Sequence, residues 1–188
     1  MSRLSHLAAI LLVAVLATGC TISGPRYTTN YAAVETLKSA NLAPVKVGAI
    51  GKPANDKKVE SVSIRGSTYK SPYGSFTEYF RAALRDELDH ANLLDDKSGT
   101  EIEGTLLRNE LNGAGVSTGY AEIEAKLAVR REGSVVYERT KVGREEWPSS
   151  FIGGVAIPRA AQNYPLAIKK VLNEFYADPE FIAALKKK

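Results

Sequence analysis

An alternating run near the middle of the chain constrains the fold most. Apolar residues at Ala121, Ile123, Ala125, Leu127 and Val129 alternate with charged residues at 122, 124, 126 and 130. Side chains along a strand point to opposite faces in turn, so the run predicts a strand with one buried and one wetted face. Glu132 and Gly133 predict a tight turn. We expect a partner strand from about Val135 to Arg144, ending before Trp147 and Pro148.

Three shorter runs predict further strands, at residues 45–50, 59–64 and 101–106. A helix is expected to begin after Ser75, because Ser75 and Glu78 have the spacing of a capping box. Its apolar stripe repeats at helical spacing up to about Asn92. The stripe consists of Phe76, Phe80, Ala83, Leu84, Leu88 and Ala91. The Ser-, Gly- and Tyr-rich stretch 66–74 is expected to be a loop.

A second helix is predicted by a stripe near the C-terminus. It consists of Ala161, Tyr164, Ile168, Val171, Leu172 and Phe175. Pro158 suits the first turn of this helix, whereas Pro165 either kinks it or marks its real start. Asp178 and Pro179 predict the cap and first position of a short last helix. The resulting order is β-β-α-β-β-β-α. It predicts an α+β fold, with an antiparallel sheet and two main helices packed on one face.

The N-terminus has the layout of an export signal. Arg3 is followed by a short apolar run at residues 7–16 and then by Ala17, Thr18, Gly19 and Cys20. The run is too short to span a bilayer. One alternative is an ordinary signal, in which Ala17 and Gly19 form the small-residue cleavage pair. Cleavage there would leave a free thiol at Cys20.

This segment resembles bacterial lipoprotein signals, in which small residues lead directly into a cysteine. The resemblance implies cleavage before Cys20 and lipidation of its thiol, although Ala17 stands where Leu is common. Thr21 replaces the Asp that retains lipoproteins at the inner membrane of enteric bacteria, so the resemblance favours the periplasmic face of the outer membrane. We therefore divide the chain into a signal (1–19), a lipidated cysteine with a flexible tether (20–43), and one periplasmic α+β domain (44–188).

The residue inventory contains little that points to catalysis, and we predict no enzyme, cofactor or metal. His90 and Asp86 could form an oriented base, but an exposed ion pair on the polar face of the helix is the better explanation of their spacing, because such surface pairs are common. No Cys and His residues have zinc-ligand spacing, and Asp95 and Asp96 lack a calcium loop. Acidic and basic residues are interleaved, with a formal net charge of +4, which argues against a nucleic-acid partner.

Four aromatic residues are candidates for docking a partner: Tyr69, Tyr73, Trp147 and Phe151. Exposed aromatic side chains favour interfaces, whereas packing in the core is the alternative. The expected partners are therefore a membrane, through the N-terminal lipid, and a protein of the cell envelope.

Residues 77–94, 102–111, 120–129, the hairpin to Arg144 and the helix at 160–185 resemble the YajG-like outer-membrane lipoproteins in layout. That family offers no catalytic residues to transfer. The leading hypothesis is a non-catalytic lipoprotein that docks an envelope partner. A lipid-handling role is the alternative, beside the LptE-like lipoproteins or the auxiliary lipoproteins of lipid-transport ABC systems. A hydrolase is a third hypothesis, against which the residue inventory argues.

Overall fold

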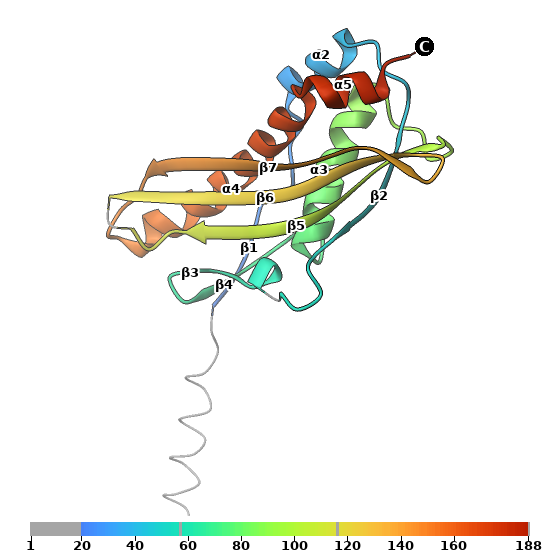
Figure 1. Ribbon diagram of the computed structural model, residues 1–188. Coiled ribbons are helices and arrows are strands. Elements are labelled where there is room, and N and C mark those ends of the chain that lie inside the picture. Colours follow the sequence, from blue (N-terminus) through green and yellow to red (C-terminus); the bar gives the residue numbers. More distant parts are fainter. Residues whose placement is uncertain (1–19, 57, 116, 188) are drawn as a thin grey trace, which may run out of the picture.

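The computed structural model describes residues 20–56, 58–115 and 117–187, so the predicted signal at 1–19 lies outside the described residues. Its main feature is a long twisted sheet with the strand order β2-β5-β6-β7 (Figure 1). The strands are β2 (Lys46–Gly51), β5 (Thr100–Asn112), β6 (Thr118–Arg131) and β7 (Ser134–Pro148). The β5–β6 and β6–β7 pairs are antiparallel, whereas β2 runs parallel to β5.

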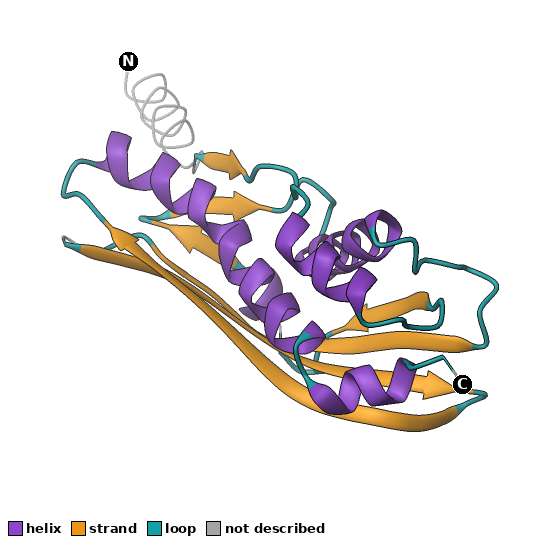
Figure 2. Ribbon diagram, turned by 90° about the horizontal axis from the view of Figure 1, so that it is seen from above, coloured by secondary structure: helices purple, strands orange, loops and turns teal. Residues whose placement is uncertain are grey.

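Helices cover one face of this sheet, and Figure 2 shows them on the same side. The helix α4 (Gly153–Tyr176) lies across β6 and β7, and α3 (Phe76–His90) lies on β2. A short helix, α5 (Pro179–Leu185), packs against β7, with the Asp178 side chain accepting a hydrogen bond from the Glu180 amide. The apolar side chains of β6 point toward these helices and are buried, whereas its charged side chains lie on the open face.

A smaller sheet of order β1-β4-β3 lies beside one end of the long sheet. Its strands are β1 (Thr21–Ser23), β3 (Val62–Ile64) and β4 (Ser67–Lys70). β3 and β4 form an antiparallel hairpin, and β1 pairs with β4 in the parallel sense. A cluster of aromatic rings connects this sheet to both main helices. Tyr69, Phe76, Tyr79 and Tyr164 pack with ring centroids 5.3 to 5.9 Å apart.

The predicted α+β class is confirmed, and the predicted strands and helices are found in roughly the expected order. Ser75 caps α3 as predicted, since its hydroxyl accepts a hydrogen bond from the Glu78 amide. The start of α4 differs from the prediction. The helix begins at Gly153 and contains both Pro158 and Pro165.

Pro165 is tolerated because the carbonyl that it leaves without a helical partner finds another donor. A proline cannot donate to the residue four positions earlier, here Ala161. The Tyr69 hydroxyl donates to the Ala161 carbonyl instead, at 3.4 Å. A tyrosine that lies far away in the sequence therefore supplies a donor where Pro165 has none, which favours the continuation of α4 through this position.

Two predictions for the first half of the chain are wrong. The segment 20–43 is folded rather than a flexible tether, since it contains β1 and the helix α2 (Tyr31–Ser39), with Val34 and Leu37 buried. The stretch 66–74, predicted as a loop, contains β4. In addition, the strand expected at 59–64 begins at Val62, because Lys58–Glu60 forms a 3-10 turn. Contacts distant in sequence order these polar segments, and local composition does not reveal such contacts.

The contact between α4 and β7 predicts a specific sensitivity at Gly143. A Cβ atom there would meet the Ala167 carbonyl oxygen and lie 2.6 Å from the Val171 amide nitrogen, both in the helix backbone. We expect Gly143→Ala to lower the free energy of unfolding by about 1–3 kcal/mol, since neither backbone can move away freely. Urea unfolding followed by circular dichroism measures this change.

Gly99→Ala is the matched control, because a Cβ atom at Gly99 meets no other atom within 4 Å. Equal urea midpoints for the two variants would show that α4 does not lie as close to β7 as the structure has it.

Candidate functional site

Cys20, the predicted lipidation site, is exposed at the edge of the small sheet. Its carbonyl oxygen accepts a hydrogen bond from the Thr68 amide at 3.0 Å, and β1 begins at the next residue. A thiol at this position is accessible to a modifying enzyme. A lipid attached there would have no spacer between itself and the folded domain.

The chain after β1 is held on α3 by side-chain hydrogen bonds. The Tyr79 hydroxyl donates to the Pro25 carbonyl at 2.9 Å, and the Thr29 hydroxyl donates to the Asp86 carboxylate at 2.7 Å. Between these two contacts, Tyr27 is buried and its hydroxyl donates to Glu87. These contacts explain why a segment with the composition of a linker is ordered on the domain.

Glu87 is a buried carboxyl group that forms no ion pair with any residue the structure describes. Burial raises its pKa to about 7, although the hydrogen bond from Tyr27 acts in the opposite direction. The Tyr176 hydroxyl and the Asn30 amide also lower the pKa of Glu87, but burial outweighs them. The Glu87 carboxyl group is therefore protonated, and uncharged, at mildly acidic pH.

The hairpin between β3 and β4 connects this end of the small sheet to the long sheet. Its two turn residues, Arg65 and Gly66, both have positive φ, at 50° and 81°, as a type I′ turn requires. The Arg65 guanidinium donates to the carbonyl oxygens of Gly113 at 2.8 Å, Phe151 at 2.7 Å and Ser150 at 2.5 Å. The Arg65 side chain thus connects its own β3–β4 turn to the β5–β6 loop and to the loop between β7 and α4.

The loop that Arg65 holds carries exposed apolar side chains. Phe151, Ile152 and Val155 are 79%, 64% and 42% exposed, and we call these three residues the apolar loop. They lie where β7 ends and α4 begins, beside Gly153 and Gly154. The apolar loop is the most exposed group of neighbouring apolar side chains in the described residues.

The four predicted docking aromatics do not form one surface. Tyr69 and Trp147 are buried, so the prediction that they contact a partner directly is wrong. Tyr69 belongs to the aromatic cluster, and the Trp147 indole packs beneath the backbone of Gly119. Tyr73 is half-buried against Tyr79, with the Arg26 guanidinium 5.3 Å from its ring centre. Only Phe151 is freely exposed.

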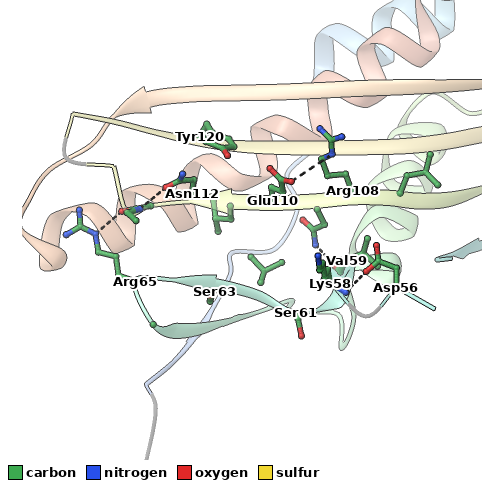
Figure 3. Close-up of a pocket in the computed structure, with 17 residues that line it drawn as sticks. Asp56, Lys58, Val59, Ser61, Ser63, Arg65, Arg108, Glu110, Asn112 and Tyr120 are labelled. Carbon is green, nitrogen blue, oxygen red and sulfur yellow. Dashed lines mark hydrogen bonds and ion pairs between the residues drawn. The ribbon is translucent and has the colours of Figure 1, made fainter. Parts of the chain in front are cut away.

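A cleft of about 720 Å³ runs along the edge of β5, and sequence reasoning did not find it. β2 pairs with this edge only as far as Thr105, and no described strand pairs with it beyond that point. The pairing of β5 with β6 also shifts at Leu107, which indicates a bulge. The 3-10 turn and β3 form the opposite wall (Figure 3). The cleft therefore contains a sheet edge whose backbone lacks a neighbouring strand.

The lining of the cleft is mixed in character. Charged and polar residues from both walls, among them Lys58, Ser61, Ser63, Glu110 and Asn112, lie beside apolar residues such as Val62 and Leu107. Asn109 fixes the two walls relative to each other. Its amide group donates to the Val59 carbonyl at 2.7 Å and its oxygen accepts from the Tyr164 hydroxyl at 2.8 Å. Because the donor and the acceptor of this buried amide both have hydrogen-bond partners, the two walls of the cleft are held at a defined separation.

His90 lies at the exposed end of α3 and outside the cleft. Its ring Nδ1 is 2.8 Å from the Asp86 backbone oxygen and 3.8 Å from its carboxylate, and the ring packs edge-on against Tyr31. Over the ranges that the structure describes, no three His, Cys, Asp or Glu side chains are placed to hold a metal ion. No helix there is both long enough and apolar enough to cross a membrane.

No protein-family model matches the sequence, and no curated protein matches it either. Among solved structures, the chain is similar to protein XCC0632 from Xanthomonas campestris, of the family DUF330, with 16% identity and a TM-score of 0.59. This match covers 87% of the chain and 96% of XCC0632, and it shows that the two proteins share a fold.

Weaker similarity extends to a candidate lipoprotein from Caulobacter crescentus and to protein CT253 from Chlamydia trachomatis. The TM-scores are 0.46 and 0.48, the identities are 13% and 10%, and the matches cover 81% and 76% of this chain. They also cover 97% and 99% of those two proteins.

The buried Glu87 predicts that the domain loses stability as the pH rises. Its pKa in the folded state, about 7, lies above its ordinary value of 4.5, so the folded protein binds the proton more tightly. The stabilisation that the protonated Glu87 supplies is complete below pH 4.5, its ordinary pKa, and is lost as the pH rises through about 7. We expect a loss of about 3 kcal/mol in the free energy of unfolding. Urea midpoints near pH 5 and about pH 8 measure it.

Glu87→Gln keeps an acceptor for Tyr27 without a titrating group, so the fall across this range is expected to become smaller. Asp89→Asn, on the exposed face of the same helix, is the control and is expected to show the same fall in stability with pH as the wild type. An unchanged pH profile in Glu87→Gln would contradict the assignment.

Proposed function

We propose that this protein is a non-catalytic lipoprotein, held by a lipid on Cys20 at the periplasmic face of the outer membrane, that docks a protein of the cell envelope. One observation carries the anchor: Cys20, preceded by a lipoprotein-like signal, is exposed at the residue where the folded domain begins. The fold shared with XCC0632 is compatible with this role but assigns no activity to it.

The cleft along β5 is the proposed docking site. Backbone groups at an unpaired strand edge can pair with an extended segment of another protein, while neighbouring side chains select its sequence. The Asn109 hydrogen bonds hold the two walls in place before a partner arrives, so little ordering is required on binding.

The composition of the cleft favours docking of a peptide segment over lipid handling. Acyl chains require a mainly apolar cavity, whereas charged groups such as Lys58 and Glu110 line this cleft. The cleft also lies at the sheet edge, and not between the sheet and its helices. A catalytic role has less support, because His90, the histidine on α3, does not line the cleft.

The anchor predicts a change of cellular fraction. We expect wild-type protein to separate with the outer membrane on a density gradient, and Cys20→Ala, which cannot be lipidated, to be lost from the outer-membrane fraction. Mass spectrometry of the N-terminal peptide checks lipidation directly. Ser23→Ala is the control, since Ser23 is exposed in β1 and has no part in lipidation. A wild-type N-terminal peptide with a bare thiol would contradict the proposal.

The docking site predicts position-specific crosslinking in intact cells. A photoactivatable amino acid at Ser63 or Glu110, both exposed in the cleft, is expected to capture the same envelope protein. Thr140, exposed on β7 outside the cleft, provides the control position. If Thr140 captured the same protein equally well, or if both cleft positions captured nothing, the proposed docking site would be wrong. Capture of phospholipid at the cleft positions would favour the lipid-handling alternative.

A further inference from the structure

We propose that the apolar loop, Phe151, Ile152 and Val155, is a membrane-contacting surface that inserts into the bilayer beside the lipid anchor. The inference rests on the proposed lipidation of Cys20. It adds a second, non-covalent contact with the membrane and fixes which end of the domain faces the lipid.

Cys20 and the apolar loop lie at the same end of the molecule. The Cys20 carbonyl accepts from the Thr68 amide, and Thr68 lies three residues after Arg65. The Arg65 guanidinium donates to the carbonyl oxygens of Ser150 and Phe151. Figures 1 and 2 agree with this chain of contacts. They show the small sheet and the beginning of α4 near one end of the long sheet, with the β6–β7 turn at the other.

The absence of a spacer brings this end to the membrane. β1 begins directly after Cys20 and pairs with β4 from its first residue, Thr21 opposite Thr68. A lipid embedded in the bilayer therefore holds the β3–β4 turn, and the loop bonded to it, close to the headgroups. A flexible tether would have removed this constraint, because a tethered domain can hold any face away from the lipid.

The chemistry of the loop fits the interfacial region of a bilayer. One aromatic and two branched aliphatic side chains are exposed together, and such groups gain free energy when they enter the boundary between headgroups and acyl chains. Ile152 is the N-cap of α4 and provides no side-chain cap to its first turn. The amide groups of that turn would then lie at the level of the lipid phosphates, which helix N-termini attract.

The test uses the lipidated protein on vesicles of phosphatidylethanolamine and phosphatidylglycerol. Lipidation blocks the thiol of Cys20, the single cysteine of the chain, so an introduced cysteine is the one thiol that reacts with an environment-sensitive fluorophore. Gly154→Cys places the probe beside the apolar loop without removing any of it, and a Cβ atom there meets nothing within 4 Å. Ser134→Cys places the probe at the exposed first residue of β7, beside the β6–β7 turn, as the matched control.

Spin-labelled acyl chains in the vesicles are expected to quench the probe at position 154 roughly twofold, because it lies at the headgroup boundary. The probe at position 134 is expected to be unaffected. Adding Phe151→Ser and Ile152→Ser to the Gly154→Cys protein is expected to reduce the quenching, while the protein still sediments with the vesicles through its lipid.

Three results would overturn the inference, and they can be told apart. Sedimentation with vesicles without quenching at position 154 leaves the anchor standing but removes the membrane-contacting loop. A blue-shifted probe that spin-labelled lipids do not quench shows that a second copy of the chain covers the loop instead. A protein that neither sediments with vesicles nor carries lipid on its N-terminal peptide refutes the anchor, and the inference with it.

Discussion

The close contact between α4 and the backbone of β7 is the constraint on which the rest of the structure depends. At Gly143 the helix and strand backbones approach so closely that no side chain fits between them. This contact sets the position of α4, whose Tyr164 joins the aromatic cluster and bonds to Asn109. The separation of the cleft walls, and the position of the loop before α4, follow from where this helix lies.

The long sheet and the helix α3 could be predicted because their signals are local. Alternation along β6 and the capping residues Ser75 and Glu78 each report a periodicity or a bond within a few residues. The same reasoning did not predict β1, α2 and β4, since pairing partners and buried contacts distant in sequence order these segments. Pro165 was an ambiguous signal for the same reason: the donor that replaces its missing N–H is Tyr69.

The candidate site was only partly predictable. The order of residues at the N-terminus predicts lipidation at Cys20, which is exposed, and of the four docking candidates Phe151 alone is freely exposed. Lipidation and docking both stay predictions. Tyr69 and Trp147 could not be separated from Phe151 by residue type, because aromatic side chains serve cores and interfaces alike. The cleft has no sequence motif. It exists because β2 stops pairing at Thr105 while β5 continues to Asn112, and that difference in strand length appears only after pairing is known.

The parallel pairing of β1 with β4 has a mechanical consequence. A force that draws the N-terminus away from the domain along the strand axis would load the three pairs from Thr21↔Thr68 to Ser23↔Lys70 in shear. Bonds loaded in shear must yield together, whereas bonds at the end of a peeling strand yield one at a time. A load applied through the proposed anchor at Cys20 would therefore move the domain as a rigid body before its first strand unravels.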